Sequence, residues 1–308
     1  MILILSESSD LSTNNVIEWL EFFKKRWFRI NSYDEVKLKY LGKDIILEVN
    51  KISIKLSKIE GFWYRRGFIY LKGLNHTNIK EFDDLQKDEI SSILEFIFYK
   101  LKKIKHINSY KNAIVNKLVI NDIARDNNII TPNDYLFSDK KNLKKILKQT
   151  DVEYISKVIS GQCIQQFDDL ILFNYTSIIK LNKLNKEDFF PSLVQNLILK
   201  KYELRIFYLD GNFYSMAIFS QKDNQTNVDF RNYNNEKPNR TVPYKLPVII
   251  EEKLNSLMKK LDLNCGSIDM IVTPENEYVF LEVNPVGQFG MVSYPCNYNL
   301  EKLIANYL

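Results

Sequence analysis

Residues 267–290 read SIDMIVTPENEYVFLEVNPVGQFG, in which two apolar runs are separated by the polar segment TPENE. The proline and asparagine of that segment predict a turn, so the two runs predict the strands of a hairpin. Side chains along a strand alternate between its two faces, which puts Glu282 and Asn284 on the same face. Pairing of the two strands would also bring Asp269 beside Glu282. The sequence therefore gathers two carboxylates and a carboxamide in one predicted hairpin.

These three side chains favour a magnesium site. Carboxylate and amide oxygens are the hard donors that Mg²⁺ prefers, with phosphate oxygens and water completing its octahedral shell. A surface hairpin that carries a few polar side chains fits the same residues, because Glu282-Val283-Asn284 is a short sequence that no established motif covers. From the hairpin alone, both interpretations stay open.

Length and composition describe an ordinary globular chain. It has 308 residues, of which 45% are hydrophobic and 26% charged, enough to bury a sizeable core in two or three lobes. The apolar start MILIL is too short for a signal peptide or a membrane span, and no other run reaches the length of a span. We therefore expect a first buried strand there, in a cytoplasmic protein without a membrane partner.

Charge and cysteine usage exclude several classes of protein. The net charge of +5 is modest, and basic runs such as LKKIKH predict solvated helix faces rather than a nucleic-acid surface. Cys163, Cys265 and Cys296 lack CxxC spacing, which predicts structural thiols instead of disulfides or a zinc site. Only two histidines are present and neither adjoins a candidate nucleophile, so a Ser/His/Asp hydrolase is not expected.

The order of apolar runs predicts an α/β chain of the α+β kind with three lobes, at residues 1–108, 109–194 and 195–308. Short strands and one long amphipathic helix, from about Lys87 to Lys105, fill the first lobe. The last lobe consists of strands and turns, then one helix, the predicted hairpin and a terminal helix. Within it YLDGNFY predicts a tight turn at Asp-Gly between two strands.

Basic and polar residues on separate predicted strands accompany the hairpin. WYRRG places two arginines at a strand end, where they meet an anion or a peptide or pack within the fold, and both interpretations stay open. A lysine inside the apolar run VEYISKVIS must find a partner or water, because its burial alone is costly. Together with Asp269, Glu282 and Asn284, a further set of basic and polar residues provides the groups needed to hold a nucleoside triphosphate and a developing acyl phosphate. In chain order they are Lys117, Lys157, the run Gln195 to Ile198, Glu203, Arg205, Arg231 and Arg240.

With these residues in this order, the sequence resembles the ATP-grasp superfamily over nearly its whole length. More narrowly it resembles the peptide maturases of graspetide or microviridin type, and among them those of grasp-with-spasm systems. The motifs that carry the resemblance are KRWFRINSYDEV, WYRRG, NKLVINDIA, ISKVIS, KKYELRIFYLDGNFYSMAIFSQ and LNCGSIDMIVTPENEYVFLEVNPVGQF. The resemblance implies an ATP-grasp fold with an N-terminal pre-ATP-grasp lobe, a central lobe and a C-terminal lobe with the metal site.

The resemblance also implies roles for the residues named above. Lys117 and Lys157 would neutralise ATP phosphates, the run Gln195 to Ile198 would meet adenine through its backbone, and Glu203 would contact ribose or adenine. Asp269, Glu282 and Asn284 would bind Mg²⁺, with two ions expected. Arg205, Arg231 and Arg240 would lie near the transferred phosphoryl group. One departure is the loop SGQCIQQFDD, in which Gly161 alone stands where ATP-grasp enzymes have a glycine-rich loop.

The implied function is an ATP-dependent ligase that activates Asp or Glu side chains of a ribosomally made precursor peptide. A hydroxyl or amine of the same peptide would then form a macrocyclic ester or amide. The partners would be the leader and core of that peptide and a second copy of the chain in a homodimer. Two alternatives stay open: a ligase of small amino acids, and a peptide-binding homologue without turnover.

Overall fold

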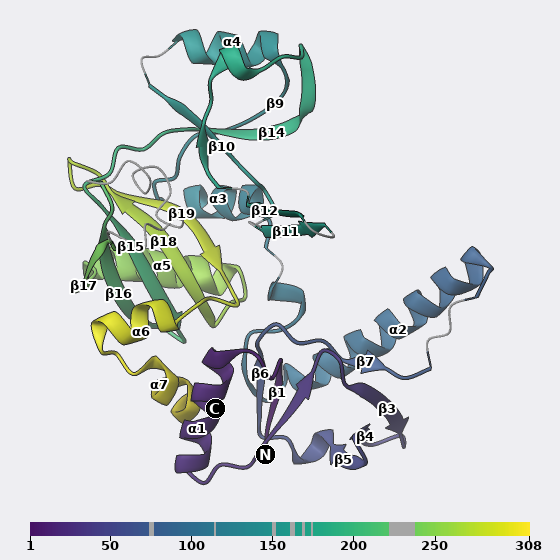
Figure 1. Ribbon diagram of the computed structural model, residues 1–308. Helices are drawn as coiled ribbons and strands as arrows, with labels where there is room; N and C mark the ends of the chain where they lie inside the picture. The colour runs from purple at the N-terminus through teal and green to yellow at the C-terminus, as the bar shows by residue number, and fades with distance from the viewer. Residues whose placement is uncertain are drawn as a thin grey trace. The chain divides into compact units, whose positions relative to one another are not determined.

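The computed structural model describes residues 1–73, 77–113, 115–149, 152–160, 164–167, 170–173, 175–221 and 238–308. The chain divides into two compact units. Unit 1 comprises residues 1–114 and 285–308, and unit 2 comprises residues 115–284. The last 24 residues therefore return to the unit in which the chain begins, as the yellow helices beside the purple segment in Figure 1 show.

Unit 1 is built on two four-stranded sheets. The first sheet is parallel with the order β2-β1-β6-β8, and the second has the order β5-β4-β3-β7. Their strands are β1 (Ile2–Ser6), β2 (Trp27–Asn31), β3 (Glu35–Tyr40), β4 (Ile45–Val49), β5 (Ile52–Lys55), β6 (Gly61–Tyr64), β7 (Tyr70–Leu71) and β8 (Lys105–Ile107). One core joins the two sheets, because side chains such as Leu5, Leu47 and Phe62 are buried in the same cluster.

Four α-helices are described in unit 1: α1 (Leu11–Phe22), α2 (Lys80–Leu101), α6 (Gly290–Cys296) and α7 (Leu300–Tyr307). Asp10 caps α1, because its carboxylate accepts from the backbone N–H groups of Ser12 and Thr13. The C-terminal helix α7 packs on α1, and Lys25 Nζ donates to the carbonyl of Ala305 at 2.9 Å. The two termini of the chain thus stabilise the same unit.

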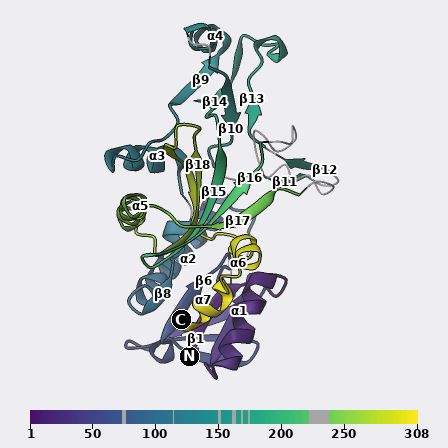
Figure 2. The same ribbon diagram turned by 90° about the vertical axis from the view of Figure 1, so that its left-hand side faces the viewer.

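A five-stranded antiparallel sheet with the order β17-β16-β15-β18-β19 forms one part of unit 2 (Figures 1 and 2). Its strands are β15 (Tyr202–Leu209), β16 (Asn212–Phe219), β17 (Arg240–Tyr244), β18 (Cys265–Val272) and β19 (Tyr278–Asn284). Helix α5 (Val248–Lys260) covers one face, where Leu254 and Met258 pack against Ile206 and Ile268. The expected tight turn is confirmed at Asp210 and Gly211, both of which have positive φ angles.

The remainder of unit 2 is a smaller sheet with the order β13-β10-β14-β9, a separate hairpin of two strands and two helices. The bounds are α3 (Lys117–Asp126), β9 (Asp134–Asp139), α4 (Lys140–Gln149), β10 (Tyr154–Lys157), β11 (Ile164–Phe167), β12 (Leu170–Phe173), β13 (Ser177–Ile178) and β14 (Asp188–Asn196). Leu143 of α4, Tyr154 and Val194 form the small core of this sheet.

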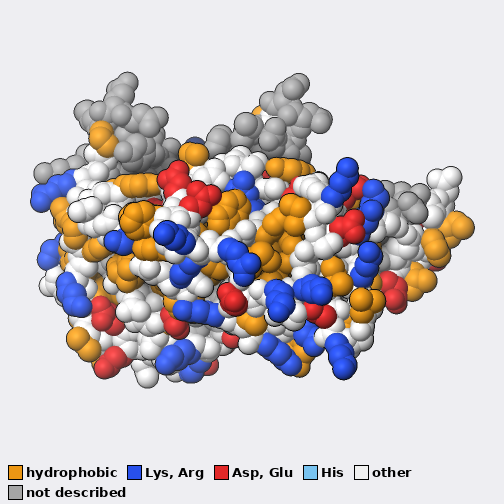
Figure 3. Space-filling view, turned by 90° about the horizontal axis from the view of Figure 1, so that it is seen from below, with side chains coloured by type: hydrophobic (Ala, Val, Ile, Leu, Met, Phe, Trp, Pro, Cys, Tyr) orange, Lys and Arg blue, Asp and Glu red, His pale blue; other side chains and the backbone are white. Residues whose placement is uncertain are grey.

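Figure 3 shows Lys and Arg side chains spread over one face, with acidic and apolar side chains between them rather than in one basic patch. Within the described ranges, no helix combines the length and apolar character that crossing a bilayer requires.

Candidate functional site

Strands β18 and β19 form the predicted hairpin and place its polar residues as expected. Asp269 pairs with Glu282 in the register, and Asn284 pairs with Ser267. A bulge follows directly, because Met270 pairs with Phe280 and Leu281 is the extra residue. Val283 and Phe280 point into the core under α5, so Glu282 and Asn284 lie on the opposite face of the sheet. We call this opposite face the charged face.

Strand β15 adds a cation to the charged face. Arg205 pairs with Asp269 in the register, and its guanidinium donates to Asp269 Oδ2 at 2.5 Å. Both side chains are 8% exposed, so this is a buried ion pair in a site of low dielectric constant. Both residues were predicted as site residues, but no local signal in the sequence indicated that their side chains would face each other.

Helix α3 supplies a second cation at its first residue. Asn116 caps the helix through bonds from Leu118 N and Val119 N, which fixes the position of Lys117. Lys117 Nζ lies 3.0 Å from Glu282 Oε2 and donates to the carbonyl of Val158 at 3.1 Å. The lysine thereby joins three elements, because Val158 directly follows strand β10.

Lys157, the other predicted phosphate-binding lysine, is the last residue of β10 and is half-buried. It pairs with Leu193 of β14 in the register. The structure therefore places it at a strand end, one residue from the carbonyl that Lys117 contacts.

Glu203 lies on the charged face two residues before Arg205. Its carboxylate forms an ion pair with Lys200 Nζ and accepts from Ser220 Oγ at 2.7 Å. Burial raises the pKa of the Glu203 carboxyl, while the bonds from Lys200 and Ser220 act in the opposite direction. Sequence reasoning missed Lys200, since its spacing of three residues from Glu203 is a weak signal in a turn before a strand.

The run Gln195 to Ile198 spans the end of β14 and the start of the connection to β15. The buried side chain of Gln195 donates to Asp134 Oδ1 at 2.6 Å, and the backbone N–H of Leu197 donates to Glu153 O at 2.7 Å. Asp134 also accepts from Asn121 and Arg125 on α3. This network, which the sequence did not reveal, ties the run to helix α3.

One predicted arginine, Arg240, is not brought to the charged face. Arg240 begins the edge strand β17, is exposed, and stacks on the Phe219 ring with 5.4 Å between guanidinium carbon and ring centroid. The register pairs Arg240 with Phe219, two residues beyond the pair of Ala217 and Val242 in the α5 core, so Arg240 lies on the α5 face. Arg231 lies outside the described residues, as does Gly161.

The donor set of the hairpin fits a hard cation. Asp269 and Glu282 are directly opposite each other on adjacent strands, and Asn284 follows on the same face. In the described part of the chain, no three Asp, Glu, His or Cys side chains form a cluster that would hold a metal ion without an amide ligand. A site here would therefore use two carboxylates, the Asn284 amide, and oxygens from phosphate or water, which is the ligand chemistry of Mg²⁺.

Comparisons with known proteins place this geometry in a known fold. A search against protein-family models found no match, and a search of curated protein sequences found none either. Among solved structures, the chain is similar to the macrocyclase MdnC of Microcystis aeruginosa MRC, which was crystallised with its precursor peptide MdnA. The identity is 28% and the TM-score 0.79, over 100% of this chain and 98% of MdnC.

Two further structures extend the similarity. A RiPP-associated ATP-grasp ligase of Chryseobacterium gregarium, in complex with ADP and a leader and core peptide, gives a TM-score of 0.82 at 23% identity, over 99% of this chain and 94% of that chain. The ATP-grasp ligase PsnB, in complex with a phosphomimetic variant of its minimal precursor, Mg and ADP, gives 0.69 at 13% identity, over 99% and 96%. The chain therefore has the ATP-grasp fold that its sequence predicted, and the three structures named above are a macrocyclase and two ATP-grasp ligases, each determined with a peptide.

Proposed function

We propose that this chain is an ATP-dependent ligase that forms macrocyclic crosslinks in a ribosomally made precursor peptide. The observation that carries the proposal is the similarity to MdnC, which extends over 100% of this chain and 98% of that one. The TM-score of 0.79 and the identity of 28% to a macrocyclase that was crystallised with its precursor peptide favour a peptide substrate over a free amino acid. The charged face of unit 2 supplies residues suited to the chemistry.

Binding of ATP would use the elements that meet around the charged face. Lys117 of α3 donates to the carbonyl of Val158, the residue that follows Lys157 of β10, and both lysines would neutralise phosphate oxygens. The run Gln195 to Ile198, at the end of β14, would meet adenine through backbone groups. Glu203, held by Lys200 and Ser220, would accept from a hydroxyl of the ribose.

Asp269, Glu282 and Asn284 would hold magnesium, for which we keep the expectation of two ions. When bound, Mg²⁺ neutralises phosphate charge and favours attack at the γ-phosphorus. Lys117 and Arg205 already face Glu282 and Asp269, and they fix the orientation of these carboxylates. The role of Arg231 near the phosphoryl group stays a prediction, and the placement of Arg240 on the α5 face gives it no part in this proposal.

The reaction proceeds in two steps. A carboxylate oxygen of an Asp or Glu side chain of the peptide attacks the γ-phosphorus of ATP, and the bond to the β-phosphate oxygen breaks to give an acyl phosphate and ADP. A hydroxyl or amine of the same peptide then attacks the acyl carbon. The bond from carbon to the phosphate oxygen breaks, and phosphate leaves with its electron pair. One ester or amide forms for each ATP, with net loss of one water from the peptide.

Within these steps the chain contributes positioning and charge. Arg205 lies next to the metal ligands and would stabilise negative charge on the phosphoryl oxygens and then on the tetrahedral intermediate. The proposed reaction relies on orientation and charge rather than on a protein nucleophile. We place the reaction in the cytoplasm, where ATP and newly made peptides are both present.

ADP release distinguishes this function from the two alternatives. The substrate would be a short peptide rich in Thr or Ser and Asp or Glu, encoded beside this chain. ADP release that depends on the peptide is expected for wild type, and Glu282→Gln should abolish it. ADP release with free amino acids instead would establish a small-molecule ligase, and binding of the peptide without ADP release would establish a peptide-binding protein.

A further inference from the structure

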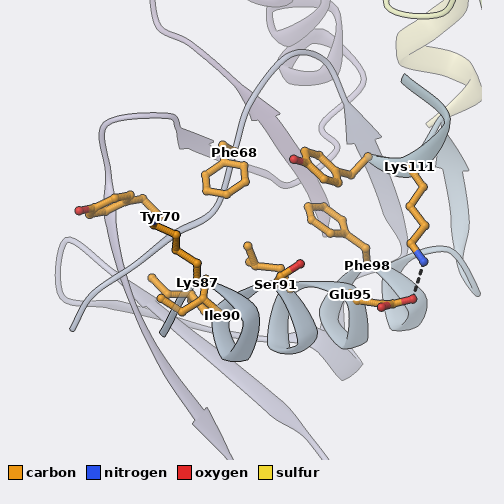
Figure 4. A pocket seen from close by; sticks show the side chains of 11 residues that line it. Phe68, Tyr70, Lys87, Ile90, Ser91, Glu95, Phe98 and Lys111 are labelled. Atoms are coloured by element: carbon orange, nitrogen blue, oxygen red, sulfur yellow. Dashed lines mark hydrogen bonds and ion pairs between the residues drawn. The ribbon is translucent and has the colours of Figure 1, made fainter. Parts of the chain in front are cut away.

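A cavity of about 340 Å³ lies between helix α2 and strand β7, and the described residues that line it all belong to unit 1. One wall is a single stripe of α2, since residues three or four positions apart follow one another along one side of a helix. The stripe consists of Lys87, Ile90, Ser91, Leu94, Glu95 and Phe98. Figure 4 shows Phe68 and Tyr70 across the space from Ile90 and Ser91. We call this space the α2 cavity.

Both walls of the α2 cavity are held in place by contacts within unit 1. On α2, Leu94 is buried in the core, and the Phe98 ring stacks on the Tyr110 ring with 5.2 Å between centroids and 9° between planes. Across the space, β7 pairs with β3 in a register that sets Leu71 beside Val36. Moving either wall into the space would break these contacts, so the cavity is preformed.

The interior of the α2 cavity is apolar and aromatic. Its side chains are those of Phe68, Leu71, Ile90, Leu94 and Phe98. Water is poorly held between such groups, so an apolar ligand gains free energy when it replaces that water. The volume is typical of a small-molecule site and fits a ligand of roughly 10–15 non-hydrogen atoms. A nucleoside triphosphate is too large and too polar for this space.

Charged groups at the edge of the α2 cavity give it a preference for an anion. Glu95 and Lys111 form an ion pair, which the dashed line in Figure 4 marks, so their charges offset each other. Lys87 Nζ lies 3.2 Å from Asp84 Oδ1, but these side chains are 59% and 52% exposed, and an ion pair so exposed is weak. Asp84 does not line the cavity, whereas Lys87 lines it one turn from Ser91. The lining therefore has an excess of positive charge, which lies at Lys87.

We propose that the α2 cavity binds a small organic acid, with an apolar ring or chain as its body and a single carboxylate. The body lies between Phe68 and Ile90, and the carboxylate accepts from Lys87 Nζ and Ser91 Oγ at the edge. An amine of the same shape would meet Lys87 with like charge, and a neutral ligand would gain nothing from that charge. The ATP-binding and metal-binding residues proposed above all lie in unit 2, so this site goes beyond the ligase function.

Three ligands that share one body test the proposal by isothermal titration calorimetry of the full chain. They are phenylbutyrate, phenylbutanol and phenylbutylamine. The acid should bind with a dissociation constant on the order of 100 µM, and the alcohol about tenfold more weakly. The amine should bind more weakly than the alcohol. No binding of the acid at millimolar concentration, or equal affinity for the acid and the alcohol, would overturn the proposal.

Two adjacent serines of α2 locate the site. Ser91→Phe directs a ring into the cavity and should weaken binding of phenylbutyrate at least about tenfold. Ser92→Phe is the matched control, because Ser92 does not line the cavity and the affinity should stay unchanged. Both serines are exposed, so both variants should fold, which circular dichroism checks. Equal affinities of the two variants would show that the acid binds elsewhere and would overturn the proposal.

A charge variant tests the role of Lys87. Lys87→Gln should weaken phenylbutyrate about tenfold and leave phenylbutanol unchanged, because only the acid uses the ammonium group. Lys103→Gln makes the same change in charge outside the lining and should affect neither ligand. Unchanged affinity for the acid in Lys87→Gln, or an equal loss for both ligands, would overturn the assignment of the carboxylate to Lys87. These measurements need no ATP turnover, so the proposed ligase function stands or falls separately.

Discussion

Replacing Asp269 by leucine removes the partner of a buried guanidinium, and replacing Arg205 by methionine removes the partner of a buried carboxylate. The two groups are 2.5 Å apart, and each side chain is 8% exposed. A charge in such a site that loses this partner loses its Coulomb attraction but keeps its desolvation penalty. We expect each single substitution to destabilise the sheet around β15 and β18 by about 3–5 kcal/mol.

The double variant Arg205→Met/Asp269→Leu should behave differently. Both charges are removed together, and apolar side chains of similar volume replace them, so we expect a stability within about 1 kcal/mol of wild type. The coupling energy between the two positions should therefore be at least about 5 kcal/mol. Since both residues belong to the proposed site, the double variant should be folded and inactive.

Hydrogen exchange measured by mass spectrometry locates the effect. Protection of the β15 and β18 amides should fall by at least about 100-fold in each single variant and recover in the double variant. All three tryptophans, Trp19, Trp27 and Trp63, lie in unit 1, so their fluorescence is an internal control that should not change. The reasoning is refuted if the single variants keep wild-type protection, or if the losses in the double variant simply add.

Three further outcomes follow from single sites. Glu282→Gln keeps the shape of the side chain and the bond from Lys117 to Val158, but it removes a metal-binding charge. ADP release should therefore fall at least about 100-fold, while the tryptophan fluorescence of unit 1 stays unchanged. Gly211→Ala should destabilise unit 2 by about 1 kcal/mol, because Gly211 has a φ of +88° and an added Cβ would not be crowded. Urea unfolding followed by circular dichroism measures this loss. Gly211→Asn should destabilise unit 2 less, and equal losses for the two variants would contradict the conformational explanation. Burial raises the pKa of the Cys296 thiol. Alkylation of Cys296 by iodoacetamide should therefore begin at higher pH in the native chain than in the urea-unfolded chain, which peptide mapping can measure. Coincident pH profiles of the two states would contradict this.

The hairpin of β18 and β19 could be predicted because its signals are local. Period-two alternation put Glu282 and Asn284 on one face, and the Pro/Asn turn indicated the pairing of the two strands. The bulge at Leu281, which the sequence did not indicate, is what sets Asp269 opposite Glu282. The partners of these carboxylates could not be predicted in the same way. Arg205 is 64 residues from Asp269 in sequence, and only the order of strands in the sheet brings them together. Lys117 reaches Glu282 from a helix in another part of unit 2.

Helices, or parts of helices, with few buried apolar side chains were the hardest to predict from the sequence. Helix α2 begins at Lys80, before the predicted start near Lys87, because its first turns expose their apolar side chains and carry no core periodicity. Helix α1 was missed altogether, although Asp10 before LSTNNVIEWLEF is a helix-capping signal. Asn and Thr in its first turns weaken the apolar pattern.

Arg65 shows how tertiary context decides between two interpretations. The sequence left open an anion site or a packed strand end. The side chain is 2% exposed, pairs with Asp10 at 3.1 Å, and donates to the carbonyls of Val286 and Gly287. The packed strand end is therefore correct, and its partners come from the chain's last segment, which no local pattern connects to residue 65.

The intact mass of the peptide after incubation with this chain, ATP and Mg²⁺ tests the central claim most directly. The account predicts that the peptide loses one water for each crosslink, that fragmentation places each loss between an Asp or Glu and a hydroxyl or amine side chain, and that Glu282→Gln produces no loss. An unchanged mass with its cognate peptide, while ATP is consumed, would contradict the assignment as a macrocyclase.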